Sequence, residues 1–202
     1  EALGRLAGDE PGAGLDVVTV TQSGCGVTRP VARDPEPAVT GTCGLREQLA
    51  AAVEAHDPHV VLVYPGVHEL APVEVVEDGE RPVVPAEAVY DDWFRAEYGT
   101  LADDLRADGT AVVFALVPPV TPPDGAPEAF EHWSPHLNRL IGDAAAARSR
   151  RNHLATIDVA GWFAALPDGA TDPTVRPDGV HLSPEGANQD RKSTRLNSSH
   201  VS

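Results

Sequence analysis

Several absences narrow the classes to which this chain can belong. It has no methionine and only one lysine, Lys192, and no apolar run approaches the length of a membrane span. We therefore expect neither a signal peptide nor a spanning helix within it. Acidic residues outnumber basic ones by 31 to 15, for a formal net charge of -16. Such a charge opposes binding to nucleic acid, so the composition predicts no nucleic-acid partner.

Cysteine is also scarce, with Cys25 and Cys43 as the only two. No Cys-x-x-Cys pair occurs, and the closely spaced histidine pairs lack a nearby third ligand, so we predict no metal and no other cofactor. A disulfide between Cys25 and Cys43 would close a loop of about 19 residues and stabilise the fold by about 3 kcal/mol. We favour this disulfide, and with it an oxidising, extracytoplasmic setting. Two reduced, buried thiols are the alternative.

Short apolar segments alternate with amphipathic ones, which predicts a parallel α/β sheet whose strands are buried on both faces. The expected strands are residues 15–20, 59–64, 111–117 and 153–159. The expected helical stripes are Leu45, Leu49 and Val53; Val89, Trp93, Leu101 and Leu105; and Leu137, Leu140, Ile141 and Ala144. We also predict a hairpin over residues 73–84. The proline-rich loop 118–127 should line a site, because ligands bind at the carboxyl ends of parallel strands.

An Asp-x-x-His pair, Asp178 and His181, lies near the end of the chain. Ser183 and Pro184 follow it and suit the start of a helix. A carboxylate three residues before a histidine can fix one ring nitrogen and leave the other free to act as a base. The pair is therefore a candidate for part of a hydrolytic triad. A polar turn with a surface histidine is the alternative.

The order of three short blocks supports the catalytic interpretation. Ser23-Gly24-Cys25-Gly26 follows the first expected strand, Gly66-Val67-His68-Glu69 follows the second, and Asp178 to His181 follows the last. Over residues 1–188 this order resembles the SGNH (GDSL-type) hydrolase family, in particular the extracytoplasmic SGNH domains fused to integral-membrane O-acyltransferases. The resemblance implies a three-layer α/β/α sandwich with a flavodoxin-like parallel sheet. It also implies an N-terminal membrane acyltransferase domain as a partner.

The resemblance implies a role for each block. His181 would be the general base, Asp178 would orient it, and the backbone N–H of Gly24 would stabilise an oxyanion. A plain turn glycine is the alternative for Gly24. His68 stands where the family has an asparagine that donates to the oxyanion, so its role as a donor is open, with packing beneath the site as the alternative. Glu69 is expected to be structural or a substrate contact and is not placed in the catalytic set.

The family's Gly-Asp-Ser block, which carries the nucleophile, has no match in this sequence. No serine occurs before Ser23, and Ser23 belongs to the second block. We therefore expect the nucleophile, and the first central strand that leads to it, to lie upstream of Glu1. On this expectation the 202-residue chain folds poorly by itself and is inactive.

Residues 190–202 resemble one reading frame of a sequencing-adapter DNA and contain the only lysine. We predict that they are a non-native tail after a single domain of residues 1–189. A basic tail for an acidic partner is the alternative.

We predict acyl-ester chemistry: transfer or removal of an O-acyl group, chiefly acetyl, on a cell-surface carbohydrate outside the cytoplasm. One alternative is a free-standing secreted esterase or lipase. The other is a catalytically silent domain that binds the glycan, which the histidine at position 68 would favour.

Overall fold

The computed structural model describes residues 16–22, 25–28, 44–66, 69, 87–106, 110–120, 133–148, 154–165, 172–179 and 181–184. The chain divides into two units. One comprises residues 20–117 and 132–160 and contains the sheet. The other comprises residues 1–19, 118–131 and 161–202 and contains the Asp-x-x-His pair. Each unit is described by itself below.

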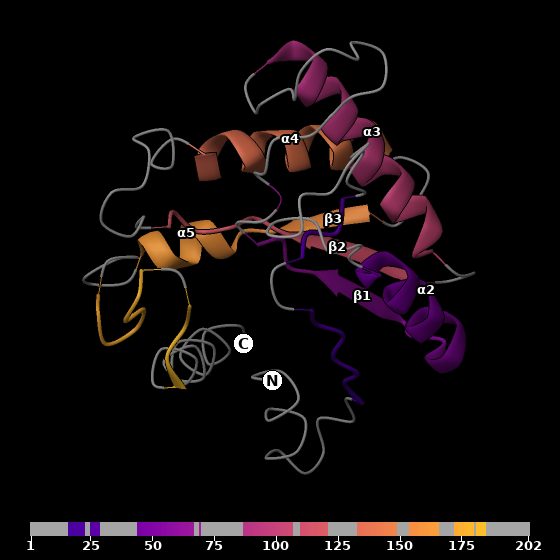
Figure 1. The fold of residues 1–202 in the computed structure, drawn as a ribbon, viewed down its shortest axis with the longest axis horizontal. Coiled ribbons are helices and arrows are strands. Elements are labelled where there is room, and N and C mark those ends of the chain that lie inside the picture. The colour runs from indigo at the N-terminus through magenta and orange to yellow at the C-terminus, as the bar shows by residue number, and fades with distance from the viewer. Residues whose placement is uncertain are drawn as a thin grey trace, which may run out of the picture. The chain divides into compact units, whose positions relative to one another are not determined.

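The described part of the chain forms a three-stranded parallel sheet in the order β1-β2-β3. The strands are β1 (Val60–Val63), β2 (Ala111–Ala115) and β3 (Leu154–Ile157), and the helices are α2 (Leu45–His56), α3 (Ala88–Asp104), α4 (Trp133–Arg148) and α5 (Val159–Ala164). A helix separates each strand from the next, as a parallel pair requires (Figure 1). The α/β fold predicted from the sequence is confirmed, and three of its four expected strands are present.

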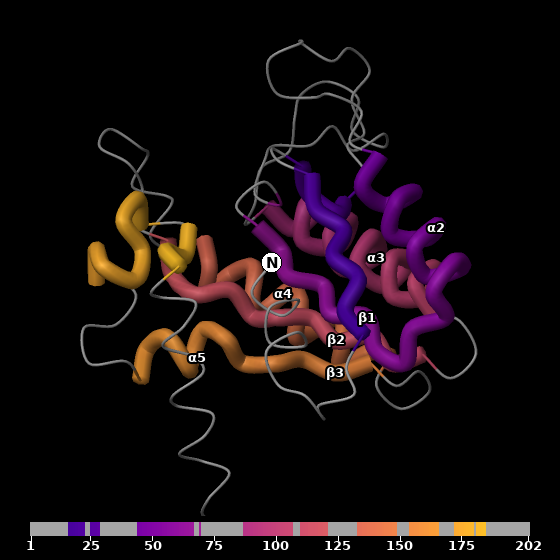
Figure 2. Tube along the Cα trace, turned by 90° about the horizontal axis from the view of Figure 1, so that it is seen from below, coloured from indigo at the N-terminus to yellow at the C-terminus, as the bar shows by residue number. Residues whose placement is uncertain are grey.

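The two faces of the sheet differ in how far they are covered. On one face lie Val63, Val112, Phe114 and Leu154, all buried. Helices α3 and α4 pack against each other, and α3 covers this face where the ring of Tyr98 meets that of Phe114 (Figures 1 and 2). On the other face Val60, Leu62 and Ile157 are 57, 42 and 48% exposed. The predicted burial of both faces is wrong for these three residues, because apolar composition does not reveal which helices cover which face.

The helical stripes are confirmed for α2 and α4 and shifted for α3. Leu45 and Val53 of α2 are buried, as are Leu137, Leu140, Ile141 and Ala144 of α4. In α3 the buried stripe is Tyr90, Phe94, Tyr98 and Leu101, whereas Val89 is 40% exposed. The predicted stripe is therefore confirmed at Leu101 and Leu105, and it is wrong at Val89, whose neighbour Tyr90 is buried instead. The aromatic stripe has the same helical spacing and buries more apolar surface.

Residues 16–20 belong to no strand, although residues 15–20 were expected to form one. A strand is defined by its ladder of hydrogen bonds, and none of the described residues pairs with this segment. An apolar run alone therefore does not make a strand here. The hairpin expected at 73–84, and all but residues 118–120 of the proline-rich loop, lie outside the described residues. Within the described ranges no helix is both long and apolar enough to cross a bilayer.

Two buried tyrosines of α3 offer a test of this packing. The hydroxyl of Tyr98 has no hydrogen-bond partner within the described structure, whereas that of Tyr90 donates to the backbone carbonyl of Glu69 at 2.6 Å. Tyr98→Phe should leave the free energy of unfolding unchanged or raise it by up to about 1 kcal/mol, and Tyr90→Phe should lower it by about 1 kcal/mol. Urea unfolding of both variants measures the difference. Equal destabilisation by the two changes would contradict this packing.

Candidate active site

The Asp178 carboxylate holds His181 through two contacts. Its Oδ1 accepts the backbone N–H of His181 at 2.6 Å, and its Oδ2 lies 2.6 Å from the ring Nδ1. A carboxylate only accepts, so Nδ1 carries the proton and Nε2 presents its lone pair. The His181 side chain is 82% exposed, and no described residue engages Nε2. A histidine oriented in this way can accept a proton at Nε2, and the predicted role of the pair as a general base stays a prediction.

A short turn before the pair sets its geometry. The Asp172 carboxylate accepts the backbone N–H of Thr174 at 2.8 Å and its hydroxyl at 2.7 Å. The chain then reverses at Gly179, whose φ of 71° lies in the left-handed region that favours glycine. The N–H of Ser183 donates to the carbonyl of Val175 at 2.8 Å, which closes the loop around the pair. The loop is therefore fixed at both ends by local hydrogen bonds.

Arg176 anchors this loop within its unit. It is 4% exposed, its guanidinium lies 5.4 Å from the centre of the Phe163 ring, and its Nη1 donates to the carbonyl of Pro119 at 2.5 Å. Pro119 belongs to the proline-rich segment that follows β2. The Asp-x-x-His loop is thus tied to one of the segments expected to line the site. The sequence analysis assigned no role to Arg176, because an arginine before a turn usually lies in solvent.

Helix α4 also holds the segment after β2, through hydrogen bonds from one side chain. The side-chain amide of Asn138 accepts the N–H of Val117 at 2.8 Å and donates to the carbonyl of the same residue at 2.9 Å. This pair of bonds reproduces those that a neighbouring strand would make. It holds the chain where it leaves the carboxyl end of β2, the edge at which ligands bind in open parallel sheets.

Glu69 makes the contact that the sequence analysis missed. It is 2% exposed, and its carboxylate accepts the backbone N–H of Val27 and, at 3.3 Å, that of Thr28. The third block is therefore joined to the chain directly after the second. Burial raises the pKa of the Glu69 carboxyl above its ordinary value, although the hydrogen bonds from Val27 and Thr28 act to lower it. To predict this contact from the sequence, one would have to know that Glu69 is buried. A single sequence does not show whether a loop glutamate is buried.

Other predicted residues of these blocks lie outside the described residues. They are Gly24, His68 and Cys43. Their predicted roles in the oxyanion site, and the disulfide between Cys25 and Cys43, therefore stay predictions. Cys25 itself is partly buried and packs against the hydrophobic core.

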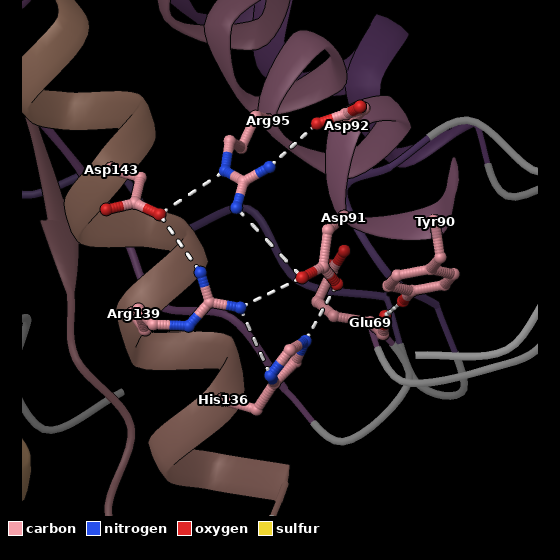
Figure 3. A network of polar contacts seen from close by, with 8 residues as sticks. All are labelled: Glu69, Tyr90, Asp91, Asp92, Arg95, His136, Arg139 and Asp143. Carbon is pink, nitrogen blue, oxygen red and sulfur yellow. Dashed lines mark hydrogen bonds and ion pairs between the residues drawn. The ribbon is translucent and has the colours of Figure 1, made fainter. Parts of the chain in front are cut away.

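A second Asp–His pair lies between α3 and α4 (Figure 3). Nε2 of His136 is 2.8 Å from Oδ1 of Asp91, and Nδ1 faces a guanidinium nitrogen of Arg139 at 3.3 Å. Because arginine only donates, Nδ1 is the acceptor and Nε2–H donates to Asp91. Both ring nitrogens are engaged, so this histidine has no lone pair to offer a substrate. The pair joins two helices, unlike Asp178 and His181.

The Asp91 carboxylate also accepts Arg139 at 2.9 Å (Figure 3). Burial alone would raise the pKa of Asp91, but the hydrogen bonds from His136 and Arg139 outweigh it and hold this pKa below its ordinary value.

No group of three or more ligating side chains in the described ranges has metal-site geometry.

A profile of the GDSL-like Lipase/Acylhydrolase family matches residues 3–188, so the chain belongs to that family. No curated protein sequence matches it. Membership supports an esterase-type enzyme that hydrolyses an acyl ester or transfers its acyl group.

Gly26 lies against the Glu69 carboxylate, and this contact can be tested. A Cβ on Gly26 would lie 2.8 Å from Oε1 of Glu69, whereas one on Gly66 would meet nothing within 4 Å. Gly26→Ala should therefore lower the free energy of unfolding by about 1–3 kcal/mol, because the buried carboxylate must move. The control Gly66→Ala should change it by less than about 0.5 kcal/mol. Denaturant unfolding compares them, and an unaffected Gly26→Ala would contradict the contact.

Asp91 should make stability depend on pH. A carboxyl whose pKa is lowered by folding stabilises above its unfolded pKa, and this contribution is lost as the pH falls through the lowered value. Asp91→Asn should lower the free energy of unfolding by about 1–2 kcal/mol at pH 7 and make its decline below about pH 4 shallower. Asp92→Asn is the control, because that side chain is 81% exposed and its partner among the described residues is Arg95. Urea unfolding at several pH values would contradict the link if both variants behaved alike.

Proposed function

We propose that this protein transfers or removes an O-acyl group, chiefly acetyl, on a cell-surface carbohydrate. The single observation that carries the catalytic part is the Asp178–His181 geometry, because a histidine oriented through Nδ1 and open at Nε2 is the base that acyl transfer needs. Family membership supplies the reaction class. The carbohydrate, the extracytoplasmic setting and a membrane acyltransferase partner domain are further parts of the proposal, supported by the order of the sequence blocks.

In the proposed mechanism, a serine hydroxyl attacks the ester carbonyl while Nε2 of His181 takes its proton. The resulting imidazolium is stabilised by Asp178, and it then protonates the departing alcohol. Water or an acceptor hydroxyl attacks the acyl-enzyme in the second half, with the same histidine as base. The Gly24 N–H would stabilise the oxyanion in both halves.

The nucleophile block of the family has no match in residues 1–202, so the assay uses the full-length product of the gene. His181→Ala should lower kcat/KM for p-nitrophenyl acetate by on the order of 10³-fold or more, and Asp178→Asn by at least on the order of 10²-fold. His56→Ala is the matched control, since this exposed histidine ends α2. It should leave kcat/KM unchanged.

Equal turnover by the parent protein and His181→Ala would refute the catalytic proposal and favour the glycan-binding alternative. Acetylated and unacetylated surface polysaccharide, offered as donor and acceptor, then test the carbohydrate part separately. Release of free acetate without any acceptor modification would favour the secreted-esterase alternative.

A further inference from the structure

Glu69 is a buried carboxylate that the proposed mechanism does not use. It is 2% exposed, and no Lys, Arg or His of the described ranges forms an ion pair with it. Its carboxylate oxygens instead accept hydrogen bonds from the backbone N–H groups of Val27 and Thr28 and from the Thr28 side chain. Burying a carboxylate without a cation is costly, and neutral donors offset only part of that cost. We therefore look for a role of Glu69 that an apolar side chain could not perform.

The contacts of Glu69 join three segments that are far apart in the sequence. Its side chain holds residues 27 and 28, and its own N–H donates to the carbonyl of Gly66 at 3.2 Å. Its carbonyl accepts the hydroxyl of Tyr90 from α3 at 2.6 Å (Figure 3). The loop after the second block, the turn after β1 and helix α3 therefore meet at one residue.

Both carboxylate oxygens of Glu69 face the chain at residues 27 and 28, so they do not point to a substrate. Gly26 lies against the same carboxylate with no room for a Cβ. This loop comes directly after Gly24, the expected oxyanion donor. A hydrogen bond to an oxyanion contributes most when its donor is already held in place before the reaction.

We propose that Glu69 is a positioning residue that fixes the loop at residues 25–28 and thereby orients the oxyanion-binding backbone of the second block. This inference rests on the proposed function, which it deepens. Glu69 acts only through the main chain and touches no reacting atom. Its hold is strongest in the ionised form, because protonation turns one oxygen into a donor and leaves less acceptor capacity for the two N–H groups.

Among the residues that the structure describes, two ionisable side chains face Glu69. From α3 the hydroxyls of Tyr90 and Tyr98 face it, and burial, followed by the Glu69 charge, raises the pKa of both. The segment at 25–28 contributes only backbone amides and the Thr28 side chain among its described contacts with Glu69. These tyrosines titrate far above carboxyl groups, and a pH-dependent change of the loop that is lost in Glu69→Gln therefore reports Glu69 itself.

The kinetic test compares Glu69→Gln with Glu54→Gln, an exposed glutamate of α2, in the full-length protein. Glu69→Gln should lower kcat for p-nitrophenyl acetate by on the order of 10²-fold and change KM little, because a misplaced donor weakens only the transition state. Glu54→Gln should match the parent. Thr28→Val removes one donor and keeps the packing, so it should lower kcat by about two- to tenfold even if Glu69→Gln does not fold.

A second readout uses amide NMR of the full-length protein and does not depend on turnover. The amide protons of Val27 and Thr28 should shift together in one step as the pH rises through the raised pKa of Glu69. The step should be absent in Glu69→Gln and present in Glu54→Gln. Amides that do not titrate, or an unchanged kcat in folded Glu69→Gln and in Thr28→Val, would overturn the inference.

The two proposals fail in distinguishable ways. If His181→Ala keeps full activity, the proposed function fails whatever Glu69 does. If His181→Ala is inactive and Glu69→Gln has the kcat of the parent, only the positioning role fails.

Discussion

The described structure around the second and third blocks depends on one carboxylate buried against main-chain amides. Glu69 lies where apolar side chains would usually pack, and its oxygens accept the N–H groups of Val27 and Thr28. Neutral donors suffice only when their positions are fixed, because each must compensate part of the lost hydration. The same requirement explains why the backbone of Glu69 is bonded to Gly66 and to Tyr90.

The network of hydrogen bonds continues from Tyr90 along α3 and into α4. The next residue, Asp91, binds His136 and Arg139, and Asn138 on α4 holds Val117. The segments after β1 and β2 are therefore both hydrogen-bonded to the packed helices α3 and α4. In the other unit, Arg176 performs a similar task for the Asp-x-x-His loop through Pro119 and Phe163. Of these anchors Asp91 and Arg176 are buried, and Asn138 is half-buried.

What the sequence predicted well was local. The strands at 60–63, 111–115 and 154–157 are compact apolar runs, and Asp178 with His181 needs only three residues of separation. What it missed depends on distant contacts. Glu69 and Val27 are 42 residues apart, and Asn138 and Val117 are 21 apart. The sequence around a loop glutamate does not show whether its side chain is solvated or buried. The prediction was wrong in the same way for Val89 of α3 and for the strand expected at 15–20, because neighbouring elements decide which face is covered and which segment pairs.

Both anchors of the sheet-edge segments recognise main-chain atoms. Glu69 binds two amide groups, and Asn138 binds an amide and a carbonyl of one residue. Every amino acid except proline offers the same groups. The side chains at positions 27 and 117 can thus be exchanged without releasing the loops, provided that they fit the space around them. Evolution or design can accordingly rewrite the chemical character of these positions while their geometry is inherited unchanged.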